Sequence, residues 1–289
     1  MPSSRSKPAF DLRSQLPELR PEQSIELLQE LHILTREGRL NQDTRRKLKQ
    51  VYHLVQFIEP LLQQVLKERG DVVLADHGAG KSYLGFILYD LVLKPCGRGR
   101  VIGVEARAEL VERSQALARR LGFERMDFLA STVQQALQHP GLPERIDVVT
   151  ALHACDTATD DAIDFALARG AQHLVLVPCC QAEVASVMRQ HKALSLKRTP
   201  LAELWRHPLH TREFGSQITN VLRCLRLEAQ GYEVTVTELV GWEHSMKNEL
   251  ILARRMAADR PAQRERARER LLQVLDQFGL QDMQTRFAG

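Results

Sequence analysis

Residues 72–86 read VVLADHGAGKSYLGF, and this stretch decides the fold. An apolar run leads into a glycine-rich turn, and a helical pattern follows directly. Glycines let the backbone approach a ligand closely, and the unpaired N–H groups at the start of the following helix attract negative charge. We therefore interpret the segment as a strand, a ligand-binding turn and a helix.

The same alternation of apolar runs and helical patterns continues downstream. Four further runs follow, at 100–104, 126–130, 147–152 and 173–177. Repeated β-α units of this kind are typical of a doubly wound parallel sheet. After a long connection that contains Trp205, two extended runs at 233–239 and 250–253 lie close together in the chain. We expect these two to pair as antiparallel neighbours.

The remaining segments frame this α/β region. Residues 1–20 are polar and contain proline, which predicts a loosely held arm. Residues 21–69 carry apolar residues at three- and four-residue steps, which predicts a helical segment. The α/β domain is expected to span 70–256, and a C-terminal helical tail to span 257–289.

Composition excludes several classes of protein. The chain has 289 residues, 44% of them hydrophobic and 26% charged, so it is neither disordered nor collagen-like. No apolar run approaches the roughly 18 residues of a membrane-spanning helix, and the amino terminus lacks the layout of a secretory signal. Five cysteines, an odd number, suit a reducing compartment. These features predict a cytoplasmic protein without a membrane segment.

The glycine turn is compatible with more than one ligand. Ala75, Gly80, Lys81 and Ser82 match the spacing of a phosphate loop, except that alanine replaces its first glycine. However, Asp76 within the turn would repel a triphosphate. A nicotinamide or flavin dinucleotide fits less well, because the third glycine of its fingerprint is missing.

A third ligand class, S-adenosylmethionine, fits the turn better. The turn is similar to the loop of class I methyltransferases, which runs acidic, any, Gly, any, Gly, any, Gly; here Asp76, Gly78 and Gly80 match, and Ser82 replaces the third glycine. Asp76 would attract the cationic groups of this cofactor. Glu105, at the end of the next apolar run, has a carboxylate that can accept both ribose hydroxyls.

Four stretches together resemble a narrower family of class I, S-adenosylmethionine-dependent methyltransferases. This family includes methyltransferase-like proteins and the glutathione-transferase-C-terminal-domain-containing protein. The resemblance implies a Rossmann-like α/β sheet with an antiparallel final hairpin, here preceded by an N-terminal helical segment and followed by a C-terminal helix. The stretches are DHGAGKSYL at 76–84, ALHACDTATDDAI at 151–163, VPCCQ at 177–181 and KNELILA at 247–253.

The resemblance also implies where the cofactor lies. Many class I enzymes place an acidic residue near the end of the third strand for the adenine, whereas this chain offers Ser131 and Thr132 there. The expected cofactor-binding residues are Asp76, Gly78, Gly80, Glu105, Ser131, Thr132 and His153.

Histidine and cysteine side chains end the fourth and fifth runs, where class I methyltransferases usually address the methyl acceptor. The candidate catalytic residues are His153, Cys155, Cys179 and Cys180. A zinc deaminase motif does not match, and a metal site is disfavoured because adjacent strand side chains point to opposite faces. A cysteine nucleophile would need an exposed thiolate of lowered pKa. The simplest hypothesis is that one cysteine packs in the sheet and the other lines the acceptor pocket with His153.

The expected chemistry is an in-line methyl transfer in which the protein aligns the acceptor and His153 accepts a proton when one must leave. Lys247 and Asn248, between the last two strands, are further candidates for this pocket. The threonines and aspartates at 157–161 are interpreted as a helix cap and first turn, with no chemistry assigned.

Basic residues favour RNA as the acceptor, ahead of a protein or a small molecule. They gather at Arg198, Arg206, His207, His210, Arg212, Arg264, Arg266, Arg268 and Arg270. Glu265 and Glu269 interleave with the last set, so a mixed-charge solvated helix is an equal interpretation there. A catalytically silent interaction module and a phosphate-loop ATPase remain alternative functions.

Overall fold

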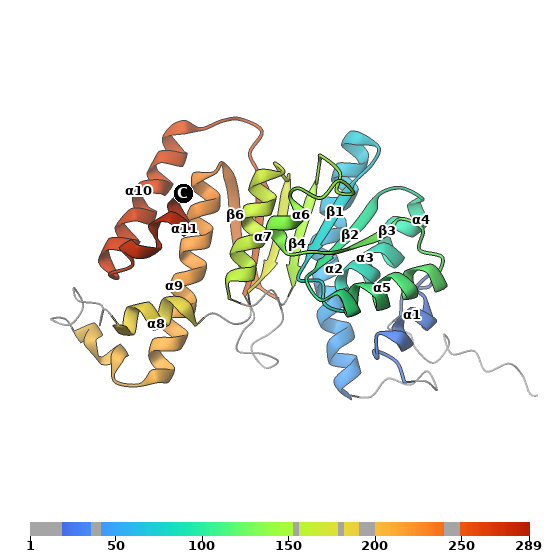
Figure 1. The fold of residues 1–289 in the computed structure, drawn as a ribbon, viewed down its shortest axis with the longest axis horizontal. Coiled ribbons are helices and arrows are strands. Elements are labelled where there is room, and N and C mark those ends of the chain that lie inside the picture. The colour runs from blue at the N-terminus through green and yellow to red at the C-terminus, as the bar shows by residue number, and fades with distance from the viewer. Residues whose placement is uncertain (1–18, 36–41, 153–155, 179–181, 191–199, 240–248) are drawn as a thin grey trace, which may run out of the picture.

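Seven strands form one mixed sheet in the order β3-β2-β1-β4-β5-β7-β6 (Figure 1). The computed structural model describes residues 19–35, 42–152, 156–178, 182–190, 200–239 and 249–289. The strands are β1 (Val73–His77), β2 (Arg100–Glu105), β3 (Met126–Ala130), β4 (Val148–Leu152), β5 (His173–Val177), β6 (Tyr232–Glu238) and β7 (Glu249–Arg255). Strands β1 to β5 are parallel, and β7 is antiparallel to both β5 and β6. The expected Rossmann-like sheet with an antiparallel final hairpin is thus confirmed.

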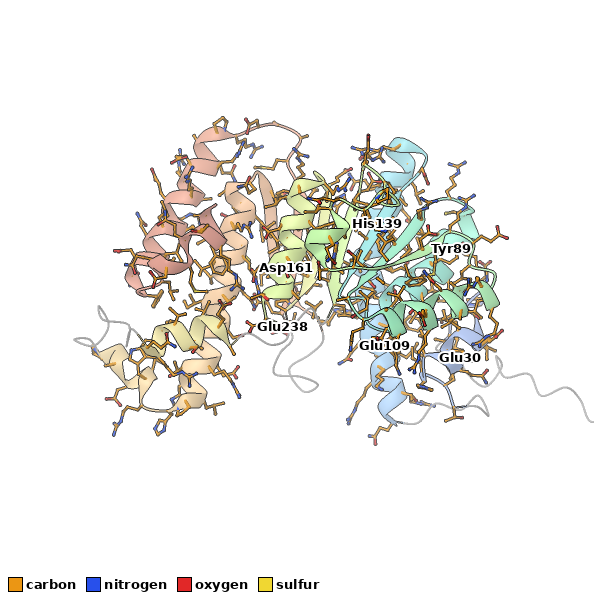
Figure 2. The ribbon with its side chains drawn as sticks, viewed as in Figure 1. Glu30, Tyr89, Glu109, His139, Asp161 and Glu238 are labelled. Carbon is orange, nitrogen blue, oxygen red and sulfur yellow. The ribbon has the colours of Figure 1, made fainter. Side chains whose placement is uncertain are left out.

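One face of the sheet is covered by α2 (Gln42–Arg69), α3 (Tyr83–Leu88) and α5 (Ala108–Arg120). Their apolar side chains pack on alternate strand residues such as Leu74 and Val101. The short helix α1 (Ile25–Glu30) adds to this layer, because Arg120 of α5 forms an ion pair at 2.5 Å with Glu30, the residue labelled at the end of α1 in Figure 2. After α3 the chain makes a π-helical turn, η2 (Tyr89–Leu93), and a last helical turn, α4 (Lys94–Cys96).

The opposite face is covered by α6 (Val133–Ala136), α7 (Thr157–Ala168) and α9 (Pro208–Ala229). Here the strands contribute the residues next in sequence, Ala75 and Ile102, because successive strand side chains point to opposite faces. The result is a three-layer α/β/α sandwich, which explains why the strands read as continuous apolar runs.

Helix α9 is the main element that the sequence analysis does not predict. It spans 22 residues of the long connection after β5. Its amino-terminal half is polar and contains Gly215, which obscures the helical pattern. The glycine is needed because α8 (Glu183–Gln190) approaches closely: a Cβ at Gly215 would lie 2.6 Å from the Ala185 Cα. Close helix packing therefore explains a residue that local propensity disfavours.

The C-terminal helices α10 (Pro261–Gln277) and α11 (Gln284–Ala288) pack on α8 and α9, at the end of the molecule away from α1 (Figure 1). Two short 3₁₀ turns, η4 (Pro200–Trp205) and η5 (Gln281–Met283), complete the described elements. Leu271, Leu275 and Phe287 are buried in the apolar cluster that these helices share. Within the described ranges, no helix combines the length and the apolar character that crossing a membrane requires.

Candidate functional site

The turns after β1 to β5 all leave the carboxyl edge of the parallel sheet, where ligands bind in open α/β folds. In the first of these turns, Gly78 has a φ of 61°, Gly80 of 54° and Ser82 of 51°. Alternate residues are therefore left-handed, a conformation that favours glycine. Ser82 adopts the backbone conformation that a third glycine would take.

Asp76, at the end of β1, is buried beneath this turn. Its carboxylate accepts hydrogen bonds from Thr150 Oγ1 at 2.7 Å and from Ser82 Oγ at 3.3 Å, and a third from the Gly85 N–H. Burial raises the pKa of Asp76 to about 6, against the smaller opposing effect of these hydrogen bonds. Among the residues that the structure describes, none of the groups that donate to Asp76 is cationic.

Gly85 in α3 is part of this arrangement, although the sequence analysis does not single it out. A Cβ there would lie 2.6 Å from Ser82 Oγ and 3.3 Å from Asp76 Oδ2. Only glycine leaves room for the carboxylate and the hydroxyl together. The sequence did indicate a special role for Gly85, because glycine is disfavoured in the first turn of a helix.

Glu105, at the end of β2, faces the glycine turn. It accepts the Gly80 N–H at 2.8 Å and forms a two-point ion pair with Arg107, whose Nε lies 2.8 Å from Glu105 Oε1 and whose Nη2 lies 3.3 Å from Oε2. Burial opposes ionisation of Glu105, but the hydrogen bonds from Arg107 and Gly80 outweigh it and lower the pKa of the carboxyl. Glu105 is therefore an ionised acceptor at the turn.

The space beside Gly80 is open. A Cβ at Gly80 would meet nothing closer than Arg107 Nη2 at 3.8 Å and the Gly78 carbonyl oxygen at 3.9 Å. The Arg107 side chain is 61% exposed, whereas that of Glu105 is 9% exposed. Arg107 can therefore turn toward solvent. This movement would free the Glu105 carboxylate and the open space beside Gly80 for a ligand.

Ser131 and Thr132 follow β3 on the same edge. The Ser131 N–H donates to the Glu105 carbonyl oxygen at 3.0 Å, so the end of β3 is tied to the end of β2. Thr132 caps α6: its Oγ1 accepts the Gln135 N–H at 3.4 Å, and Gln135 Oε1 accepts the Thr132 N–H at 3.3 Å. Both residues lie near Glu105, where the adenine was expected, and their role in binding it stays a prediction.

His77 follows Asp76 but points to the other face of the sheet. It is fully buried against Phe165, with ring centroids 4.2 Å apart. Neither ring nitrogen has a partner among the described residues, and burial lowers the pKa of His77 to about 3. The imidazole is therefore neutral and packs as an aromatic core residue.

The expected acceptor residues His153, Cys155, Cys179 and Cys180 lie outside the described residues, as do Lys247 and Asn248. Helix α7, the next element after β4, lies within them. In its first turn, Asp160 is 3% exposed and accepts hydrogen bonds from both Arg223 of α9 and Arg286 of α11. The interpretation of Asp160 as an ordinary first-turn residue was therefore incomplete: it is the centre of a buried ion-pair network.

The two arginines went unnoticed because no local motif marks them. Arg223 lies 63 positions from Asp160 and Arg286 lies 126 positions from it. The available signal was that Arg223 and Arg226 each directly follow a leucine of the apolar stripe of α9, Leu222 and Leu225. A charged residue on a buried helix face requires a buried partner.

Several of the basic residues considered for RNA binding are paired with carboxylates. The pairs are Arg206 with Glu203, Arg212 with Glu213, Arg264 with Asp259 and Arg270 with Glu228. Arg198 lies outside the described residues. Arg266 and Arg268 are exposed on α10.

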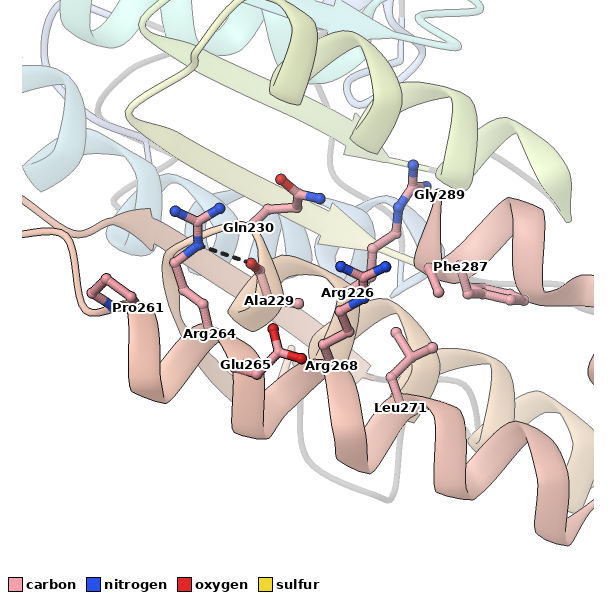
Figure 3. A pocket seen from close by; sticks show the side chains of 11 residues that line it. Arg226, Ala229, Gln230, Pro261, Arg264, Glu265, Arg268, Leu271, Phe287 and Gly289 are labelled. Atoms are coloured by element: carbon pink, nitrogen blue, oxygen red, sulfur yellow. Dashed lines mark hydrogen bonds between the residues drawn. The ribbon is translucent and has the colours of Figure 1, made fainter.

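A pocket of about 460 Å³ lies between α9, α10 and α11 (Figure 3). Arg226, Arg264 and Arg268 line it together with Glu265. The pocket includes Gln230, just before β6 begins, and β6 runs parallel to β5. It therefore lies at the amino edge of the sheet, opposite the glycine turn, and is separate from the candidate site.

Comparison with known proteins agrees with this geometry. Residues 46–187 match a family model described as a methyltransferase domain. The matched region begins in α2, ends in α8 and contains all five parallel strands. No curated protein matches the chain.

Similar solved structures are also methyltransferases. Magnesium protoporphyrin IX methyltransferase from Synechocystis PCC 6803, with bound S-adenosylhomocysteine, is 14% identical with a TM-score of 0.44, over 81% of this chain and 95% of that one. Precorrin-6y C5,15-methyltransferase from Geobacter metallireducens GS-15 is 16% identical with a TM-score of 0.39, over 69% and 88%. An rRNA methylase from Streptococcus thermophilus is 10% identical with a TM-score of 0.40, over 70% and 96%. With its family match over the parallel sheet, this chain carries a methyltransferase domain of the S-adenosylmethionine-dependent class.

Proposed function

We propose that this protein transfers a methyl group from S-adenosylmethionine to RNA. The observation that carries the cofactor assignment is the pairing of two carboxylates around one turn. Asp76 lies beneath the turn without a cationic donor among the described residues, and Glu105 faces Gly80. S-adenosylmethionine complements both carboxylates, because it carries a positive sulfonium, a positive ammonium and a ribose.

The residues at the turn fit this cofactor. Gly80 leaves open space at the backbone, and Glu105 accepts the ribose hydroxyls once Arg107 turns away to solvent. Asp76 adds negative potential beneath the turn. Ser131 and Thr132 lie on the side where the adenine is expected. When bound, S-adenosylmethionine supplies the methyl group on its sulfonium.

The acceptor is expected at the ends of β4 and β5. There His153, Cys155, Cys179 and Cys180 form the proposed acceptor pocket, in which the chain aligns the acceptor atom for in-line attack. His153 takes up a proton when the acceptor must lose one. Lys247 and Asn248 are proposed to close the pocket from the β6–β7 connection.

RNA is favoured as the acceptor because some exposed basic side chains form no ion pair with a described carboxylate. Arg266 and Arg268 on α10 form no ion pair with any described carboxylate; because the pocket that Arg268 lines is at the opposite edge of the sheet from the glycine turn, these arginines would contact RNA phosphates away from the acceptor pocket. RNA binding then releases counterions, so its affinity falls steeply as salt rises. A protein or small-molecule acceptor would give a much weaker dependence on salt.

The cofactor assignment is tested by calorimetric titration with S-adenosylhomocysteine and, separately, with ATP and Mg²⁺. We expect micromolar binding of the first, lost at least tenfold in Glu105→Gln. Asp127→Asn is the matched control, because Asp127 also pairs with an exposed arginine, Arg100 at 3.3 Å, on the neighbouring strand. Binding of ATP in place of S-adenosylhomocysteine would mean that the turn is a phosphate loop.

The acceptor is tested with radiolabelled S-adenosylmethionine and transcribed transfer and ribosomal RNA fragments. Label transferred to RNA supports the proposal, and the salt dependence of RNA binding measures the number of phosphate contacts. Label found only in added protein or small-molecule fractions would overturn the RNA assignment and leave the cofactor assignment intact.

A further inference from the structure

Two buried arginines of α9 differ in how their guanidinium groups are satisfied. Arg223 is 0% exposed, and all three of its nitrogens donate: Nε and Nη2 to Asp160, and Nη1 to Asn220 Oδ1 at 3.2 Å. Arg226 is 7% exposed, and its Nη2 donates to Asp164 of α7. Its Nε and Nη1 are buried and have no hydrogen-bond partner among the described residues. Arg226 therefore has two nitrogens whose donors are unused.

The positive charge of Arg226 is also only weakly compensated by the protein. The side chain of its partner Asp164 is 52% exposed, whereas that of Asp160, the partner of Arg223, is 4% exposed. Water screens the attraction to an exposed carboxylate, and buried donors without an acceptor cost free energy. In native proteins a buried polar group of this kind calls for a water, an ion or a ligand that satisfies it.

Arg226 lines the pocket between α9, α10 and α11 (Figure 3). Arg226 and Gln230 are four residues apart at the end of α9, and Arg264 and Arg268 are four residues apart on α10, and all four line the pocket. Side chains at this spacing lie on the same face of a helix. Each helix therefore presents a pair of hydrogen-bond donors to the space between them.

One wall of this pocket is apolar. Leu271 of α10 and Phe287 of α11 line it and are 1% and 0% exposed. Because little water reaches that wall, attraction between Arg226 and an anion in the pocket is stronger than it would be on an open surface. The pocket has a volume of about 460 Å³, which is enough for a small anionic group and part of the molecule that carries it.

Three guanidinium groups and one carboxylate line the pocket. Arg264 donates through Nη1 to Asp259, whose side chain is 65% exposed, and Arg268 forms no ion pair with any described carboxylate. Glu265 is exposed on α10, so its side chain can turn to solvent when an anion enters. The unused donors exceed what the two oxygens of a carboxylate accept, and they suit the three terminal oxygens and the double negative charge of a phosphate monoester.

We infer that this pocket binds a phosphate monoester: Arg226 donates to it from a nitrogen that has no protein acceptor, and Arg264 and Arg268 hold it from α10. The inference goes beyond the proposed function, because the pocket lies at the amino edge of the sheet, away from the glycine turn. The 5′-terminal phosphate of an RNA and a free mononucleotide present the same group, and the experiment distinguishes these two sources.

The test compares Arg268→Gln with Arg266→Gln. Both arginines are exposed on α10 without an ion pair to a described carboxylate, but only Arg268 lines the pocket. The probes are uridine monophosphate, measured by calorimetry, and a short oligouridine RNA with a 5′-phosphate or a 5′-hydroxyl, measured by fluorescence anisotropy. Arg268→Gln should weaken monoester binding by about tenfold, and Arg266→Gln by less than twofold. Glu265→Gln should tighten binding, because it removes the carboxylate that lines the pocket.

Arg226→Met distinguishes a ligand site from a structural ion pair. The change removes two unsatisfied nitrogens together with a pairing to a half-exposed carboxylate, so the Tm of the ligand-free protein should not fall. Monoester binding should nevertheless weaken by at least about tenfold. A lower Tm with unchanged monoester binding would overturn the role of Arg226 in the pocket.

The source of the phosphate follows from the two RNA probes. Tighter binding of the 5′-phosphate RNA than of the 5′-hydroxyl RNA, lost in Arg268→Gln, would support the RNA end, and binding of uridine monophosphate without that preference would support a free monoester. No monoester binding by the wild type, or equal effects of Arg268→Gln and Arg266→Gln, would overturn the inference. S-adenosylhomocysteine binding should stay within twofold of wild type in every variant, and its absence in the wild type would refute only the proposed function.

Discussion

Two buried aspartates lie in the two halves of the proposed site, and they are held in opposite ways. Asp76 on the proposed cofactor side is 2% exposed, and Asp160, near the start of α7 on the proposed acceptor side, is 3% exposed. Hydroxyl groups and a backbone amide surround Asp76, and burial raises its pKa to about 6. Burial also acts on Asp160, but hydrogen bonds from Arg223 and Arg286 outweigh it and lower the pKa of that carboxyl.

At these two sites, neutral donors leave the pKa of the buried carboxyl raised, whereas guanidinium groups lower it. The Asp160 carboxylate is already paired with two guanidinium groups, so it stabilises the fold and needs no ligand. Asp76 still lacks a positive neighbour among the described residues, so a cationic ligand is the group that would complete it. Two aspartates of similar burial thus differ: one is a structural anchor, and the other is a proposed binding residue.

The largest expected contrast comes from making the same substitution in both halves. Asp160→Asn leaves the buried Arg223 guanidinium without its carboxylate and removes one of the two carboxylates that pair with Arg286, so it should lower the free energy of unfolding by about 3–5 kcal/mol. Asp76→Asn should change it by less than about 1 kcal/mol at pH 7, because the lost hydrogen bonds are offset by relief from burying a charge. Urea unfolding at pH 7 measures both. Equal losses in the two variants would remove the contrast.

The pH dependence should also have opposite signs. The folded-state pKa of Asp76, about 6, is higher than its unfolded value of about 3.9, so the native state binds more protons between these values and stability falls as pH rises through that window. Two pKa units correspond to about 3 kcal/mol, so Asp76→Asn should gain about that much relative to wild type between pH 4 and pH 7.

Asp160 should act in the other direction, because its folded-state pKa is lowered: its contribution is present above the unfolded pKa and is lost as pH falls through the folded value. Urea unfolding of the Asp76→Asn variant and the wild type at both pH values is the measurement. A stability difference that does not vary with pH would show that Asp76 is solvated in solution.

A smaller effect is expected at Ser82, where a left-handed backbone and a hydrogen bond to Asp76 coincide. Ser82→Ala loses the hydrogen bond and keeps the unfavourable φ, whereas Ser82→Gly loses the bond and relieves the backbone. The glycine variant should therefore be the more stable of the two by about 1 kcal/mol. Thermal or urea unfolding of the pair decides this, and the reverse order would mean that the turn is not left-handed at Ser82.

The smallest effect concerns Arg107, whose guanidinium is proposed to leave Glu105 before the ribose of the cofactor binds. Arg107→Ala should tighten binding of S-adenosylhomocysteine by less than about fivefold, because exposed ion pairs contribute little. Arg100→Ala, which removes the exposed arginine paired with Asp127, is the calorimetric control and should leave the affinity unchanged. Weaker binding in Arg107→Ala would show that the arginine contacts the cofactor.

The cofactor half was largely predictable from sequence because its parts are adjacent in the chain. Asp76, Gly78 and Gly80 form one contiguous motif, and Glu105 ends the next apolar run. The strands were predictable for the same reason, since burial on both faces leaves continuous apolar runs. Whether these residues bind the cofactor stays a prediction.

The acceptor half was less predictable because its contacts join distant parts of the chain. Asp160 looked like an ordinary helix-start acid until α9 and α11 brought Arg223 and Arg286 to it. Helix α9 is not predicted from sequence because Gly215 and polar residues weaken its local helical pattern. The helix is stabilised instead by its packing against α8. Information of this kind lies in the tertiary structure and not in any window of sequence.

The ion pair between Asp160 and Arg286 also affects the order in which parts of the fold can form during synthesis. During synthesis, chains fold from the amino terminus as residues emerge from the ribosome. The strands and turn around Asp76 and Glu105 can come together once β4 has emerged, but Asp160 stays without its second guanidinium until residue 286 is released. A nascent chain can therefore form the glycine turn while Asp160 still lacks Arg286, and the ion-pair network at the start of α7 is complete only after the last helix has docked.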